Sequence, residues 1–277
     1  IDETEWNEFV AYSKDNKEEF FELFNSEGDI DKEELTDLIS SIANKRRNSD
    51  DPEIFKPETD KKNGDEKTIV NVFIENSGSM DGYVKGNTEF ETALSGLLVD
   101  IDIDYNKNLN INFINTKISP SEVRELEDFA GALDPSKKPY KDNYRKTSDL
   151  NKIFKLVLDS TNQDNISIFI SDCIYSLGKN KDTEGALGRS QSLTKLHFSD
   201  KFREFDFSTI VLKLNSKFKG NYYDKNSKVT YLTNENRPYY VWIVGQDKLI
   251  QKFQKNIDLT KLKGFENSYF LSNSTMS

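Results

Sequence analysis

Side chains that commonly bind metals or act as nucleophile partners are scarce in this sequence. Its 277 residues include one cysteine and one histidine. The single cysteine, Cys173, excludes an internal disulfide and a zinc site built from cysteines. His197 alone would have to serve any Ser-His-Asp triad, and no Gly-x-Ser-x-Gly motif accompanies it. The sequence therefore argues against the commonest hydrolytic sites.

An excess of positive charge is also missing. The chain has 38 Lys and Arg against 48 Asp and Glu, which gives a net charge of -10. Such a chain is not attracted to nucleic-acid phosphates or to an anionic membrane, and we expect neither as a partner. No apolar run approaches the roughly 20 residues of a membrane span, so we expect no transmembrane segment. We expect a soluble chain, either cytoplasmic or exported after removal of a signal.

The apolar pattern divides the chain into four parts. Residues 1–45 have helical spacing and predict an N-terminal helical segment, while the polar stretch 46–66 predicts a linker. From 67 to 257, apolar runs of strand type alternate with helical patterns, as is typical of an α/β sheet domain. Within that domain residues 217–235 predict a β-hairpin insertion, and residues 258–277 are left as a C-terminal tail.

Aromatic residues are concentrated in the expected hairpin. Tyr222, Tyr223 and Tyr231 are spaced for a two-faced ribbon. Tyrosine rings are favoured at protein contacts, so an exposed hairpin predicts an interface. In the alternative interpretation, the rings simply cover the last strand.

The most informative stretch follows the apolar run 69–74. The run ends in Glu75-Asn-Ser77-Gly-Ser79-Met, and a helical pattern comes next. One carboxylate and two hydroxyls therefore gather at the carboxyl end of a predicted strand, where open α/β sheets place their ligands. All three groups offer oxygen donors, which suit a hard cation such as Mg²⁺ or Mn²⁺.

This arrangement resembles the von Willebrand factor type A domain, whose metal-ion-dependent adhesion site begins with Asp-x-Ser-x-Ser after the first strand. Here Glu75 stands in the first position, which makes the motif a variant Glu-x-Ser-x-Ser. Two later positions also match. Thr147 lies just before a predicted helix, and Asp172 follows the apolar run 166–171. The resemblance covers residues 67–257.

The resemblance implies a fold and a ligand set. The fold would be α/β, with a doubly wound, mainly parallel six-stranded sheet in which strands 69–74 and 166–171 are central neighbours. Ser77 and Ser79 would bind the cation directly, and Thr147 directly or through water. The remaining members of the metal site, Glu75 and Asp172, would hold coordinated waters and supply negative charge.

The resemblance also implies a function. We expect a non-enzymatic protein-binding module that docks a partner, through a partner carboxylate, on a divalent cation at the top of the sheet. An alternative is an adaptor for a chaperone-like ATPase, a common setting for intracellular bacterial members of this family. Separately, the Asn- and Lys-rich composition suggests a low-GC bacterium. A metal-dependent hydrolase with Ser77 or Ser79 as nucleophile is the third reading. It has no evident general base beyond Asp172 and Glu75.

Overall fold

The computed structural model describes residues 68–121, 126, 129, 133–136, 140, 145, 147–175, 183–223 and 228–272. The expected helical segment 1–45 and the linker 46–66 lie outside these residues. In chain order the elements are β1 (Ile69–Glu75), the short 3-10 helix η2 (Met80–Gly82), α3 (Glu89–Asp104), β2 (Leu109–Ile114), β3 (Ile118–Pro120), α5 (Leu150–Asp159), β4 (Asn165–Ser171), α6 (Thr183–Glu204), β5 (Phe207–Tyr223), β6 (Val229–Gln246), α7 (Asp247–Asn256), η3 (Leu259–Lys261) and β7 (Phe265–Ser272).

One mixed sheet of seven strands organises these elements, in the order β3-β2-β1-β4-β6-β5-β7. β1 pairs in parallel with β2 and with β4, so the expected neighbours 69–74 and 166–171 do lie side by side. The other four pairs, β2–β3, β4–β6, β6–β5 and β5–β7, are antiparallel. The prediction of a mainly parallel, doubly wound, six-stranded sheet is therefore wrong.

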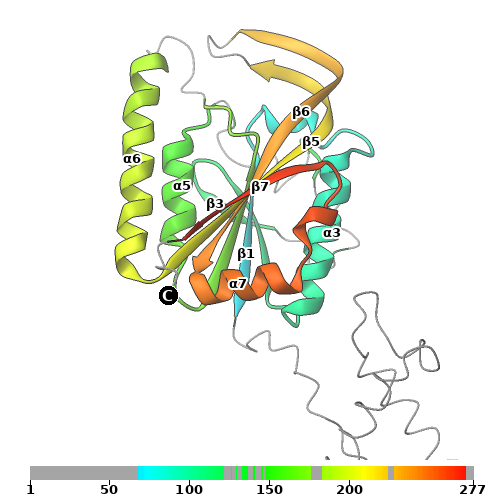
Figure 1. Cartoon of the computed structure of the whole chain (residues 1–277). Helices are drawn as coiled ribbons and strands as arrows, with labels where there is room; N and C mark the ends of the chain where they lie inside the picture. Colours follow the sequence, from blue (N-terminus) through cyan, green and yellow to red (C-terminus); the bar gives the residue numbers. More distant parts are fainter. Residues whose placement is uncertain are drawn as a thin grey trace, which may run out of the picture. The chain divides into compact units, whose positions relative to one another are not determined.

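The connection between β5 and β6 explains the change of direction. Only residues 224–228 separate Tyr223 from Val229. A parallel neighbour needs a crossover of a dozen or more residues, usually with a helix, and this segment is far too short for one. β5 and β6 therefore form one long hairpin, whose outer part includes residues 217–235 and extends beyond the rest of the sheet (Figure 1). The expected insertion is the continuation of two sheet strands.

The seventh strand comes from the segment expected to be a tail. β7 lies within residues 258–277 and pairs with β5 from Ser208↔Ser272 to Leu214↔Phe265. Helix α7 and the turn η3 return the chain to this edge of the sheet (Figure 1).

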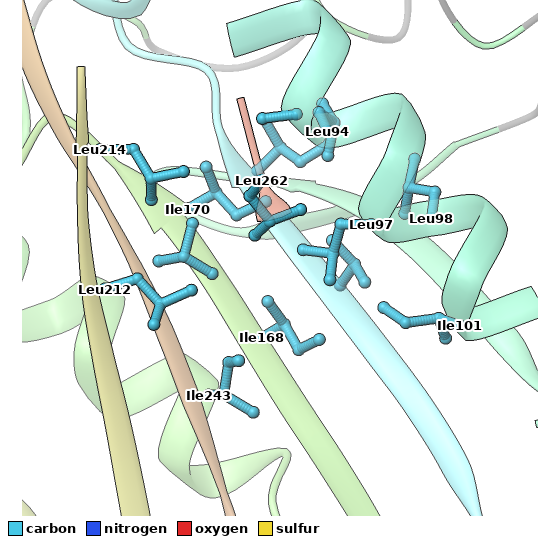
Figure 2. Close-up of a cluster of buried hydrophobic side chains, with 14 of the residues drawn as sticks. Leu94, Leu97, Leu98, Ile101, Ile168, Ile170, Leu212, Leu214, Ile243 and Leu262 are labelled. Atoms are coloured by element: carbon cyan, nitrogen blue, oxygen red, sulfur yellow. The ribbon is translucent and has the colours of Figure 1, made fainter. Parts of the chain in front are cut away.

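Helices cover both faces of the sheet (Figure 1). The α3 and α7 side holds the larger core cluster, and α5 and α6 cover the smaller cluster around Phe73, Phe169 and Phe207. Figure 2 shows how the larger cluster forms. Leucines of α3 meet alternate side chains of the strands, and the labelled residues are Leu94, Leu97, Leu98, Ile101, Ile168, Ile170, Leu212, Leu214, Ile243 and Leu262. Burial of each such side chain contributes about 1.5–3 kcal/mol, which fixes β1 and β4 between two helical layers.

No helix in the part of the chain that the structure describes is long and apolar enough to cross a membrane.

Candidate metal site

The predicted site residues come from the carboxyl ends of two neighbouring parallel strands. Glu75 ends β1 and leads into Ser77 and Ser79, while Asp172 follows β4 directly. Because β1 and β4 run in parallel, their carboxyl ends lie at the same edge of the sheet. The four residues are 0–6% exposed, so the sheet brings four oxygen-bearing side chains together in a buried position.

The two serines form a close pair of hydroxyls. Ser77 Oγ and Ser79 Oγ are 3.0 Å apart. Two neighbouring oxygens around an octahedral Mg²⁺, each about 2.1 Å from the ion, are also about 3 Å apart. The spacing of the hydroxyls therefore fits a divalent cation as well as it fits a hydrogen bond.

Asp172 has one carboxylate oxygen without a partner. Oδ1 accepts a 3.0 Å hydrogen bond from the backbone N–H of Ile174, whereas Oδ2 is buried and no described group donates to it. A buried carboxylate oxygen without a donor is costly, and a cation is one group that removes the cost. Burial raises the pKa of Asp172, against the lowering effects of the Ile174 N–H, the Ser79 hydroxyl and the charge of Arg237.

Glu75 is held by two hydroxyl donors. Ser148 Oγ donates to Oε1 at 2.7 Å, and Ser171 Oγ makes a short hydrogen bond to Oε2. Complete burial, followed by the negative charge of Asp172, raises the pKa of Glu75 to about 7, although the hydroxyls of Ser171, Ser148 and Ser77 favour its charged form. The negative charge of Asp172 thus disfavours the charged form of Glu75, and a positive ion near both carboxyl groups would offset that repulsion.

Thr147 does not share in these contacts. It is half-buried, and no hydrogen bond of the described residues joins it to Glu75, Ser77, Ser79 or Asp172. Its neighbour Ser148 lies within reach of Glu75 instead, at 2% exposure. Sequence reasoning missed both Ser148 and Ser171. Each is the sequence neighbour of a predicted site residue, and that position was the one signal that could have found it. Which of two adjacent residues points into a site depends on the local direction of the backbone, which the sequence does not give.

Arg145 holds the motif loop, which is defined here as residues 76–79. Its Nε donates a 2.6 Å hydrogen bond to the carbonyl of Asn76, and its own carbonyl accepts from the N–H of Gly78 at 3.1 Å. The guanidinium also forms an ion pair with Asp81 and lies 5.2 Å from the centre of the Tyr140 ring. These contacts fix the backbone that carries both serine hydroxyls.

The hairpin packs on η2, the turn that continues the motif loop. A Cβ on Gly82 would lie 2.3 Å from the Phe218 ring, and one on Gly220 would lie 2.9 Å from Gly82 Cα. β5 therefore packs directly on η2, the turn that follows Ser79. Within η2, the sulfur of Met80 accepts a 3.2 Å hydrogen bond from the N–H of Asp172.

A pocket of about 190 Å³ opens beside the hydroxyl pair. It is lined by Ser77, Gly78, Ser79, Arg145, Ser148, Ile174 and Tyr223. One water takes about 30 Å³ of liquid volume, so the pocket holds several waters or the end of one acidic side chain. Tyr223 belongs to the hairpin, so β5 contributes one wall of the pocket.

Among the residues placed by the structure, no three His, Cys, Asp or Glu side chains form a cluster suited to a metal ion. The donors available here are instead two hydroxyls and two carboxylates, which are hard oxygen ligands. This set fits Mg²⁺ or Mn²⁺ in chemistry and in the spacing of the hydroxyls.

Comparison of the chain with protein-family models, curated proteins and solved structures finds no match.

Proposed function

We propose that this chain is a non-enzymatic protein-binding module that docks a partner through Mg²⁺ or Mn²⁺, in the manner of a von Willebrand A adhesion site. One observation carries the proposal. The hydroxyls of Ser77 and Ser79 are 3.0 Å apart, the Ser79 hydroxyl also reaches the Asp172 carboxyl, and Oδ2 of that carboxyl is buried without a described hydrogen-bond partner. Hydroxyls at octahedral spacing beside a carboxylate without a donor are better explained by a cation than by a closed polar network.

The ligand set determines what the cation does. In the proposal Ser77 and Ser79 hold it with neutral oxygens, and the two carboxylates supply charge through water or from behind the hydroxyls. A cation held mainly by neutral ligands stays electrophilic and accepts a further anionic ligand. Ser148 lines the open side of the pocket, where water would occupy the remaining positions until a partner binds.

The partner would present a carboxylate to the pocket. The chain carries a net charge of -10, so a carboxylate on a partner is repelled unless a cation lies between them. Binding should therefore depend on the metal. The outer hairpin offers apolar contact area, since Val229 is 49% and Tyr231 56% exposed. Such side chains add the hydrophobic part of an interface around the metal contact.

Calorimetric titration with Mn²⁺ and Mg²⁺ tests the first step. We expect about millimolar or tighter binding by the wild type, as for metal sites with few charged ligands. The Ser77→Ala/Ser79→Ala variant should lose it, whereas Ser192→Ala, a serine on the exposed side of α6, should not. Equal binding by all three proteins, or by none, would contradict the proposal.

Two further measurements separate binding from catalysis. Acetate, a minimal carboxylate, should increase the affinity for Mn²⁺ if the cation has an open position for a partner. A generic phosphate ester should not be turned over with Mg²⁺ present. Turnover that disappears in Ser77→Ala would instead assign a hydrolase.

A further inference from the structure

In the part of the chain that the structure describes, no strand pairs with the outer edge of β7. This strand lies at one end of the strand order and carries three consecutive exposed apolar residues, Tyr269, Phe270 and Leu271, which are 65%, 43% and 42% exposed. Opposite residues of an antiparallel pair point to the same face. Tyr269 and Leu271 pair with Val211 and Thr209, and Phe270 pairs with Ile210, so apolar side chains are exposed on both faces of the edge.

The two edges of the sheet differ in how well they are protected. β3, at the other end, has three residues and finishes at Pro120, which cannot donate a ladder hydrogen bond. β7 has eight residues, Phe-Glu-Asn-Ser-Tyr-Phe-Leu-Ser, with neither proline nor lysine. Proteins normally protect an edge strand of this length, because its free N–H and C=O groups recruit another strand.

The charge of this edge allows a second copy of the chain to approach it. Glu266 is the one charged residue of β7, and its carboxylate is paired with Lys213 of β5 at 2.6 Å. The edge is thus locally neutral in a chain with a net charge of -10. Two copies of this chain repel one another elsewhere on average, but they can approach at a neutral apolar edge.

We propose that β7 is a homodimer interface, in which it pairs antiparallel with β7 of a second copy. Antiparallel pairing of two identical strands has two-fold symmetry, so outward-facing backbone donors on one copy meet acceptors on the other. The N–H of Ser268 is an exception, because it already donates to Oδ1 of Asn267. The exposed side chains of each strand then pack on those of its copy as cross-strand pairs. The sheet continues through the interface. This inference is independent of the cation site, because β7 is separated from β1 and β4 by β5 and β6.

Sedimentation equilibrium over a concentration series tests the interface. We expect the wild type to dimerise with and without EDTA, since no metal is involved. Tyr269→Lys/Leu271→Lys places like charges on facing strands and should weaken dimerisation at least about tenfold, a change of about 1.4 kcal/mol. The matched control Leu193→Lys/Leu196→Lys adds the same charge to two exposed apolar positions of α6 and should dimerise like the wild type.

A second measurement needs no variant. Hydrogen exchange of the amides in residues 265–272 should slow as the wild-type concentration rises, because dimerisation protects the outer edge of β7. A wild type that stays monomeric at its highest soluble concentration would overturn the proposal. This holds also if the edge pairs with a strand of a different protein. So would a dimer that the β7 lysines leave unchanged, or a dimer that EDTA dissociates.

Discussion

The hydroxyl of Ser148 donates a 2.7 Å hydrogen bond to Oε1 of Glu75, and this contact joins the start of α5 to the end of β1. Ser171 supplies the donor for the other carboxylate oxygen. Each end of the Glu75 carboxylate is therefore fixed by a different element. We infer that Glu75 orders the site and supplies charge, while the paired hydroxyls of Ser77 and Ser79 face the pocket as ligands.

The pH dependence of stability should report on Glu75. Its pKa is raised from 4.5 to about 7, mainly by burial, so between these values the folded state binds more protons than the unfolded state. The contribution of Glu75 to the stability of the metal-free protein should therefore be fully present below about pH 4.5. It should be lost as the pH rises to about 7. Urea unfolding measured across this range tests the slope.

Glu75→Gln cannot titrate and should remove that part of the slope. The matched control is Glu235→Gln, an exposed glutamate of the hairpin, which should leave the slope unchanged. The assignment fails if both variants have the wild-type slope.

Asp172→Asn should separate stability from metal binding. The variant keeps the shape of the side chain and removes the buried carboxyl group, whose pKa is raised by burial. The metal-free protein should be at least as stable as the wild type, because an amide costs less to bury than a carboxylate without a donor. Cation affinity should fall about 10–100-fold, as is typical when a supporting carboxylate is removed. Calorimetry and thermal unfolding measure the two effects; a parallel fall in both would indicate a structural role only.

The central strands were predictable from sequence, whereas strand direction was not. The runs 69–74 and 166–171 are mostly apolar, which is typical of strands buried on both faces, and they are neighbours in the sheet. The runs 207–214 and 239–244 also predict buried strands. A run of apolar residues does not indicate whether its strand pairs in parallel or antiparallel with its neighbour. The direction followed from the short connection 224–228, which leaves no room for a crossover. β7 was missed because its exposed Tyr269, Phe270 and Leu271 do not alternate with polar residues.

The site was partly predictable because strand ends in a parallel pair must meet. That rule brings Glu75, Ser77, Ser79 and Asp172 together. The rule says nothing about loops that arrive from elsewhere. Ser148, the neighbour of the predicted ligand Thr147, contacts Glu75, and sequence spacing alone does not single out this residue. Arg145 lies in a polar stretch and meets Asn76 across 69 residues of chain, so only the fold could reveal it.

The contact between the hairpin and η2 should be detectable by comparing the free energies of unfolding of two glycine-to-alanine variants. In Gly220→Ala the new methyl would lie 2.9 Å from the Gly82 backbone, so β5 or η2 must shift, at a cost of about 1–3 kcal/mol. Gly96→Ala is the control, since no atom lies within 4 Å of its Cβ position in α3, and it should stabilise by about 0.5–1 kcal/mol. Urea unfolding gives both values.

Because η2 follows Ser79 directly, Gly220→Ala should also weaken Mn²⁺ binding, whereas Gly96→Ala should not. If the two variants bind Mn²⁺ equally, the hairpin does not support the motif loop.

Glu75→Asp tests why the motif begins with glutamate. The shorter side chain cannot reach both Ser148 and Ser171 from the same backbone position, so at least one buried hydroxyl loses its acceptor. We expect a loss of about 1–3 kcal/mol in the free energy of unfolding, measured with urea. Combining Glu75→Asp with Ser148→Ala removes the hydroxyl together with its acceptor. The pair should therefore cost less than the sum of the single variants, by about 0.5–3 kcal/mol. Additive losses would mean that the length of Glu75 is not set by its contact with Ser148. An unchanged stability with tighter Mg²⁺ binding in Glu75→Asp would mean that Glu75 acts on the cation and not on the two hydroxyls.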